Sequence, residues 1–266
     1  MTNEDRPSII SGDDEISSWD GWNYLSQDQW ENLERANVLE LLTSLIEHDG
    51  LRAFAIYVLS MSHPKFWDTP ASSTGRHHPQ HEKKDMELPN GIVITGLIKH
   101  LWMVMVFAMD GLRRYGYDSK RIGSLPTPRA RMRDVVAFAV LLHDWARNGN
   151  PLEGKWGQYT NKLHGEMAAD VIENQLLPVF LDKFPEAPEH DEIKAMVSES
   201  CQGINWHYGI WSSDKMHPRD PRLSDSDAIL QEADFHSSRH FIGEPDRDRM
   251  LEVLKSCSPL YWKRIP

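Results

Sequence analysis

Cysteine is scarce in this 266-residue chain, which has only Cys201 and Cys257, far apart. Two isolated cysteines exclude a disulfide-rich scaffold and a cysteine-based zinc site. The longest apolar runs, Leu101–Met109 and Val135–Leu142, are too short to span a bilayer. Alternating strand patterns are nearly absent, and the first residues do not resemble a secretory signal. We therefore expect a cytoplasmic, all-α protein that does not bind membranes.

Positive charge is also in short supply, with 29 Lys and Arg against 40 Asp and Glu, a net charge of −11. Nucleic-acid and anionic-membrane binders usually present basic surfaces, so the total alone argues against both classes. The negative charge is unevenly distributed, however. Residues 1–35 contain nine acids and two arginines, a net of −7, which leaves −4 for the rest of the chain.

Apolar residues at helical spacing dominate the sequence. The pattern predicts one helix from Trp30 to near Gly50 and a second over Leu51–Ser60. Further helices are expected at about 93–115, 131–147, 161–183, 190–206, 225–241 and 246–256. Prolines and glycines indicate loops at 62–91 and 117–129.

Three parts of the chain are expected from these patterns. Residues 1–62 form an acidic N-terminal arm and a helical extension rich in tryptophan. Residues 63–245 form the main domain, and residues 246–266 a C-terminal helix and tail that pack on it. The main domain contains most of the 13 histidines, the commonest metal ligand in proteins.

The dipeptide His143-Asp144 follows an apolar helical run and is the central signal. Adjacent side chains point about 100° apart within a helix, but they can converge on a cation where the helix ends. Most isolated His-Asp dipeptides are surface pairs, so the other metal-competent positions decide the reading. His100 and Asp234 lie in apolar helical segments, where an unpartnered Asp would be costly; His164 opens a helix and His207 closes one.

In this order, the six residues resemble the HD-domain superfamily of metal-dependent phosphohydrolases over about residues 66–242. The basic pattern of the superfamily is matched by His100, His143, Asp144 and Asp234. His164 and His207 match two further histidines of its binuclear members. The resemblance implies a helical bundle of the HD type.

A narrower resemblance concerns the segment PASSTGRHHP at 70–79, with His77 and His78, which precedes Gly96-Leu97 and His100. An HH element upstream of the ligand motif is similar to that of a 3′-to-5′ exoribonuclease branch, of HD domains linked to conjugation proteins, and of uncharacterised bacterial and phage proteins. The chain departs from the pattern at Thr95, where glycine is usual, and at Arg147, where lysine is usual.

The resemblance implies two divalent metal ions, and imidazole and carboxylate ligands suit Mn, Fe, Co, Ni, Mg or Zn. One ion is assigned to His100, His143, Asp144 and Asp234, and the other to His164, His207 and Asp144. The implied reaction is attack of a metal-activated hydroxide on the phosphorus of a nucleotide or single-stranded nucleic acid. The two ions would also offset the −4 of the body, so net charge does not exclude such a substrate.

Asp144 and Arg147 are the candidate catalytic residues. Arg147 is expected to reach a phosphate oxygen. An equally good interpretation is that its positive charge interacts with the dipole at the C-terminus of the helix. Candidate substrate contacts are His77, His78, Lys155, Thr160 and Arg239. The tryptophans on either side of His207, Trp206 and Trp211, are further candidates for base stacking, although such aromatics more often lie in a core.

Two other functions are compatible with the same residues. A minority of HD proteins with six such ligands are mixed-valent di-iron oxygenases that act on small oxygenated or phosphonate substrates, and the ligand types suit iron equally well. A non-catalytic nucleotide sensor is the third possibility, which the complete ligand set disfavours. The oligomeric state is not predicted.

Overall fold

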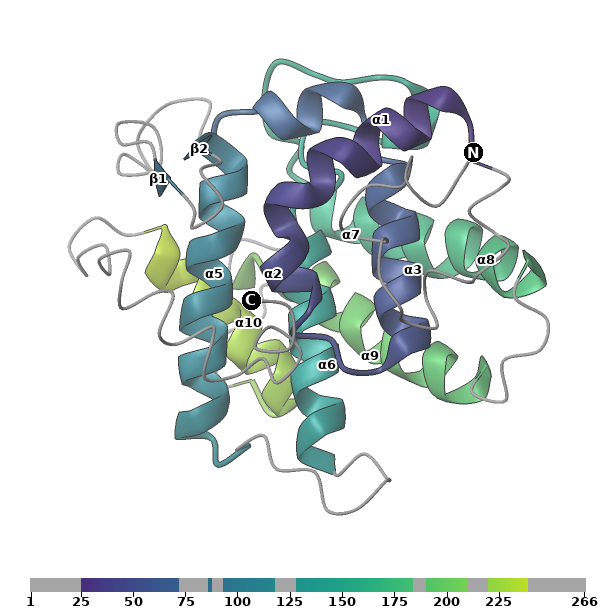
Figure 1. The fold of residues 1–266 in the computed structure, drawn as a ribbon. Helices are drawn as coiled ribbons and strands as arrows, with labels where there is room; N and C mark the ends of the chain where they lie inside the picture. Colours follow the sequence, from purple (N-terminus) through teal and green to yellow (C-terminus); the bar gives the residue numbers. More distant parts are fainter. Residues whose placement is uncertain are drawn as a thin grey trace, which may run out of the picture.

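The computed structural model describes residues 25–71, 86–87, 93–117, 128–183, 190–209 and 220–238. These ranges are mostly helical, which confirms the all-α fold class (Figure 1). None of their helices is long and apolar enough to cross a membrane. The elements are α1 (Gln27–Ala36), η4 (Asn37–Leu39), α2 (Glu40–Thr43), α3 (Asp49–Ser60), η5 (Pro64–Asp68), β1 (Met86–Glu87), β2 (Val93–Ile94), α5 (Gly96–Arg114), α6 (Pro128–Leu142), η6 (Pro151–Glu153), α7 (His164–Asp170), η7 (Val171–Leu176), α8 (Leu177–Lys183), α9 (His190–Trp206) and α10 (Asp225–Ser237).

Two helices begin with reciprocal caps that the sequence encodes locally. At α1, the Gln29 amide N–H donates to the Ser26 hydroxyl, and the Ser26 N–H donates to the Gln29 side chain at 2.6 Å. Ser224 and Asp227 form the same arrangement at the start of α10. Such capping boxes satisfy amides that have no partner inside the helix, and they fix where each helix starts.

The predicted single helix from Trp30 to Gly50 is wrong. The chain leaves the α-helical conformation after α1, continues through η4 and α2, and reaches Gly50 in the first turn of α3. His48 caps α3, and the Asp134 carboxylate accepts the Glu47 and His48 amides at 2.9 Å each. This contact with α6 holds the backbone extended before α3, and a local pattern cannot reveal it.

Other boundaries also differ from the predictions. The predicted helix at 131–147 is α6, which begins at Pro128 and ends at Leu142. The predicted helix at 161–183 is divided into α7, the π-helical η7 and α8. The predicted loop at 62–91 contains η5 and β1, and β1 pairs with β2 in antiparallel register. The first 24 residues, the predicted helix at 246–256 and the tail lie outside the described residues.

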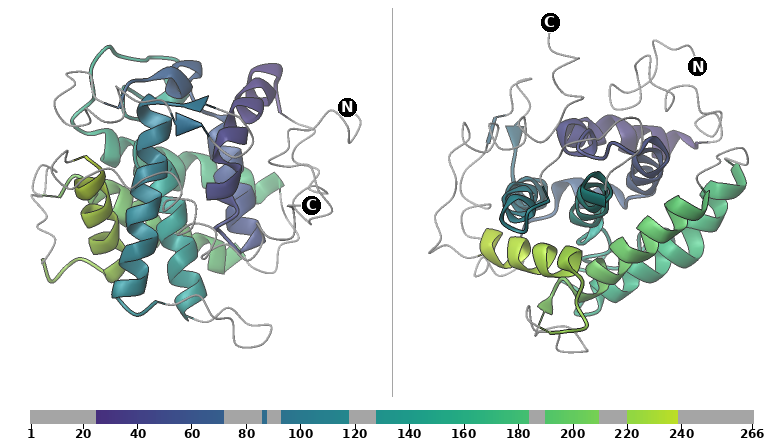
Figure 2. Two further views of the ribbon diagram at one scale, coloured as in Figure 1. Left: turned by 60° about the vertical axis from the view of Figure 1, so that its left-hand side comes forward. Right: turned by 90° about the horizontal axis from the view of Figure 1, so that it is seen from below.

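Helices α5 and α6 lie at the centre, and α10 crosses them on one side (Figure 2). Helix α9 packs against α6, α7 and α10, which brings the ends of several helices together. Two indole N–H groups fasten the N-terminal helices to this arrangement: Trp102 donates to the Val38 carbonyl and Trp145 to the Ser62 hydroxyl, each at 3.0 Å. The domain borders expected after 62 and 245 stay predictions.

Candidate metal centre

Five segments carry the predicted ligand residues to one place. His100 lies one turn into α5, and Asp234 lies in the last turn of α10. The other four lie where helices begin or end: His143 and Asp144 in the turn after α6, His164 at the first position of α7, and His207 directly after α9. The packing of α9 against α6, α7 and α10 brings these helix ends together.

The residues form two groups that share Asp144. One group consists of His100, His143 and Asp144, and the other of Asp144, His164 and His207. Within each group one ligand atom per residue lies within 4.8 Å of the others, and all five side chains are buried. Three converging donors that are shielded from bulk water could hold a metal ion in each group.

The Asp144 carboxylate connects the groups through separate oxygens. Its Oδ1 lies 2.9 Å from Nε2 of His164 and 3.9 Å from Nε2 of His207. Its Oδ2 lies 3.7 Å from Nε2 of His100 and also 3.7 Å from Nε2 of His143. Each oxygen therefore faces one histidine pair, which is the arrangement a carboxylate needs to serve two neighbouring ions.

Asp234 extends the first group. Its Oδ1 lies 3.2 Å from Nε2 of His100 and 4.0 Å from Nε2 of His143. Its side chain is 17% exposed, whereas that of Asp144 is 5% exposed. The aspartate predicted to be costly without a partner thus faces two imidazoles from the more open side.

Hydrogen bonds fix the proton positions of the four histidines. Nδ1 of His143, His164 and His207 lies 2.6–2.8 Å from the carbonyl oxygen three residues earlier, at Val140, Asn161 and Ile204 respectively. A carbonyl oxygen only accepts, so each of these Nδ1 atoms must carry a proton. For His100 the partner is the Ser237 hydroxyl at 3.2 Å, which donates its own proton to the Asp234 carbonyl and so accepts from Nδ1.

In the neutral rings, every Nε2 therefore presents a lone pair to the interior of the cluster. These atoms are close, at 3.0 Å between His164 and His207 and 3.4 Å between His143 and His100. Facing lone pairs repel each other unless one ring is protonated, and burial beside His164 and His143 lowers the pKa of His207 to about 3. A metal cation removes this repulsion, so the donor set fits the two ions that the sequence implies.

Arg147 is held beside Asp144 rather than directed to an open surface. Its Nη1 donates to Asp144 Oδ2 at 2.6 Å, and its Nη2 donates to the Ala71 carbonyl. Burial alone would raise the pKa of Asp144, but Arg147, His143 and His164 hold it well below its usual range. Arg147 therefore keeps this carboxylate ionised and oriented. Its expected contact with a substrate phosphate stays a prediction.

The described residues give little support to the predicted substrate contacts. Lys155 is 83% exposed and pairs with Glu153 at 3.5 Å. Thr160 is half-buried, and within the described ranges it has no hydrogen bond to the cluster. His77, His78 and Arg239 lie outside the described residues.

Sequence reasoning missed Gly165, which follows the ligand residue His164. A Cβ atom at this position would lie 2.6 Å from the Ile204 carbonyl oxygen and 3.1 Å from two ring atoms of His207. A glycine therefore allows α7 to approach the end of α9 and bring the second histidine pair together. Nothing in the sequence marks this glycine, because the contact joins residues about forty positions apart.

Comparisons with protein-family models, with curated proteins and with solved structures found no match. The case for a metal centre therefore depends on the geometry of these side chains.

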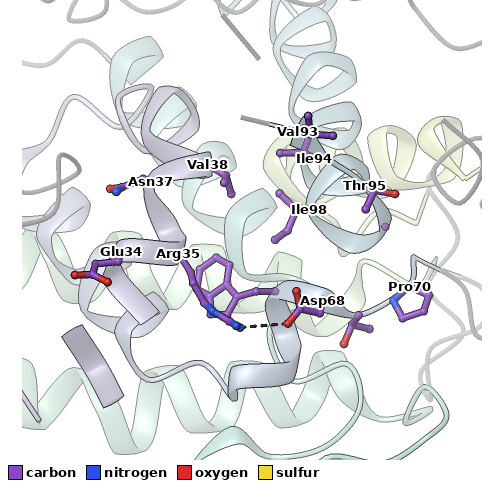
Figure 3. A pocket seen from close by; sticks show the side chains of 13 residues that line it. Glu34, Arg35, Asn37, Val38, Asp68, Pro70, Val93, Ile94, Thr95 and Ile98 are labelled. Carbon is purple, nitrogen blue, oxygen red and sulfur yellow. Dashed lines mark hydrogen bonds and ion pairs between the residues drawn. The ribbon is translucent and has the colours of Figure 1, made fainter. Parts of the chain in front are cut away.

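A separate pocket of about 550 Å³ lies beside the N-terminus of α5 (Figure 3). Trp67, Val38, Ile94 and Ile98 contribute apolar surface to it, and Arg35 is one of its charged lining residues. Ile98 and His100 are two residues apart in α5, so their side chains leave the helix about 200° apart. The pocket and the histidine cluster therefore lie on different faces of this helix.

Proposed function

We propose that the protein is an HD-type phosphohydrolase that uses two divalent metal ions to hydrolyse a nucleotide or nucleic-acid phosphoester. One observation carries this proposal: a single carboxylate, Asp144, faces one histidine pair with each oxygen. Two bound ions would supply a hydroxide nucleophile at neutral pH and positive charge beside the phosphoryl oxygens. The native metals belong to the set that imidazole and carboxylate ligands favour, Mn, Fe, Co, Ni, Mg or Zn.

The chain contributes charge and orientation to this chemistry. Asp144 and Asp234 are anionic and Arg147 is cationic, so these three residues sum to −1. The histidines are neutral ligands, which leaves the site positive once two divalent ions are bound. A positive, buried site attracts and orients an anionic phosphoester more strongly than an exposed site does, because water screens it less.

Arg147 has a supporting role in the proposal. It is connected to the Asp144 carboxylate and to the carbonyl of Ala71, so it fixes the shared ligand relative to the 69–71 segment. Residues that orient ligands in this way typically change metal affinity or activity about 10- to 100-fold when they are replaced.

The first test compares the metal content and the activity of one purified preparation. Protein reconstituted with Mn²⁺ is expected to bind about two ions per chain and to hydrolyse bis-p-nitrophenyl phosphate, mononucleotides or short oligonucleotides. Asp144→Asn should lose both properties, because the amide removes the negative charge that the two groups share and replaces one of the two oxygens with an NH2 group that cannot bind a metal ion. Asp110→Asn, on the exposed surface of α5, is the matched control and should keep both.

The outcome separates the proposal from its alternative. Bound metal without hydrolysis of any phosphoester in the panel refutes the phosphohydrolase. Consumption of dioxygen by the iron-loaded protein in the presence of oxygenated or phosphonate substrates would then support the di-iron oxygenase. If the purified protein binds no metal, both the phosphohydrolase and the di-iron oxygenase are refuted.

A further inference from the structure

Exposed apolar side chains occur close to the second histidine pair. Leu163, which directly precedes His164, is 50% exposed, and Tyr208, which directly follows His207, is 39% exposed. Tyr159, in the segment between Arg147 and His164, is 66% exposed. A phosphate group does not bind apolar side chains, so a substrate that contacts Tyr208 or Leu163 would do so through an apolar part.

Tyr208 contacts both imidazoles of that pair. Its ring centroid lies 5.2 Å from that of His164 with an interplanar angle of 90°, and 5.6 Å from that of His207 with an angle of 81°. Within the described part of the chain, it is the one ring outside the histidine set that contacts either residue. A single side chain thus contacts the buried ligands and is also accessible to solvent.

The segment that carries Tyr159 is tied to the cluster by its backbone. The Asn161 N–H donates to the Arg147 carbonyl at 2.7 Å, and the Asn161 carbonyl accepts from Nδ1 of His164. The exposed Leu163 therefore directly precedes a ligand residue in a segment whose backbone contacts the cluster.

We infer that Tyr208 is the residue on which the planar base of the substrate stacks, so that it selects nucleotides over sugar phosphates. The inference rests on the proposed function and names the substrate feature that this site recognises. An exposed tyrosine ring beside a phosphate-binding centre suits a ligand that joins a phosphate to an aromatic base, because stacking depends on planarity more than on base identity. Trp206, a candidate from the sequence, is half-buried and precedes His207 within α9.

The test uses pairs of ligands that differ only in the base. One pair is adenosine 5′-monophosphate and ribose 5-phosphate, which share the phosphate and the 5′ oxygen that leaves. The other pair is a short single-stranded oligonucleotide and its abasic counterpart. Hydrolysis and equilibrium binding are both measured on metal-loaded protein, and metal content is determined for every variant.

Tyr208→Ala is expected to weaken use of the base-containing ligand about tenfold, mainly through KM or Kd, and to leave its base-free partner unchanged. Tyr208→Phe retains the ring and should behave as the wild type. Tyr115→Ala is the matched control, because Tyr115 is 38% exposed but lies at the end of α5 beside Glu232.

Three results would overturn the inference. The first is that Tyr208→Ala weakens hydrolysis and binding equally for both members of a pair, which would mean that Tyr208 only positions the histidines. The second is that the wild type does not prefer the base-containing member. The third is that the wild type has this preference and Tyr208→Ala retains it. Failure of the proposed function is distinguishable. A metal-loaded wild type that binds nucleotides through Tyr208 but hydrolyses none would retain the inference and refute the phosphohydrolase.

Discussion

The substitution Gly165→Ala tests how the second histidine pair is held together. The added Cβ would lie 2.6 Å from the Ile204 carbonyl oxygen, whereas ordinary contact begins at 3.4 Å, so the two helices must separate by about 0.8 Å. The same carbonyl accepts the Nδ1 proton of His207, and the His207 ring would lie 3.1 Å from the new atom. One methyl group therefore disturbs the ligand and the group that orients it.

The size of this shift predicts a selective loss. Functional sites tolerate displacements of about 0.5 Å. A separation near 0.8 Å should therefore lower the affinity for the ion held by His164 and His207 by about tenfold or more. The ion held by His100 and His143 should be affected less. Overpacking of this kind costs about 1–3 kcal/mol in the free energy of unfolding.

The affinity for metal is measured by calorimetric titration of the purified variant, and the free energy of unfolding is measured in urea. Gly50→Ala is the control, because its Cβ would also lie 2.6 Å from a neighbour, but that neighbour is the terminal methyl of Ile193, which can move. It should keep both ions. If Gly165→Ala binds two ions with wild-type affinity, the close approach of α7 to α9 does not maintain the site.

Three further results are expected. Ser237→Ala removes the hydroxyl that accepts from Nδ1 of His100 and should weaken the first ion about 10- to 100-fold in metal titrations, with the second ion unchanged. Asp134→Ala leaves two buried backbone amides before α3 without their acceptor and should cost about 2–4 kcal/mol in urea unfolding, while metal content per folded chain stays the same. Metal-free protein should lose stability as the pH falls from 6.5 towards 3: the folded His207, with its pKa lowered to about 3, takes up a proton later than the unfolded chain does. Urea unfolding that is independent of pH over this interval would contradict the last expectation.

The sequence predicts an element well when local signals agree with its packing. Helix α9 has the predicted bounds of 190–206, and the turn after Leu142 places His143 and Asp144 where a helix end allows them to converge. The break between α1 and α3 was not predictable, because Asp134 holds the backbone there from a helix almost ninety residues away. Amphipathic spacing alone continues the helix through this point.

The same limit applies to the candidate site. The order of the histidines and aspartates identifies which residues assemble, but the sequence does not show how the two Asp144 oxygens divide between the pairs. It also suggests the tryptophans beside His207 as base-stacking residues, but Trp211 lies outside the described residues, and stacking on Trp206 stays a prediction. The sequence does not indicate that the Tyr208 ring contacts two of the ligand rings. These features depend on side-chain directions at helix ends, which no linear spacing specifies.

The carbonyl contacts of His143, His164 and His207 share one form, in which each ring is bound to the oxygen three residues before it. The contact that orients each imidazole therefore lies within a segment of four residues and involves no other segment. Tertiary packing then brings these three segments, together with His100 on α5, to a common point. The topology of the chain thus determines where the rings meet, whereas the proton position of each of the three rings is determined within its own four-residue segment.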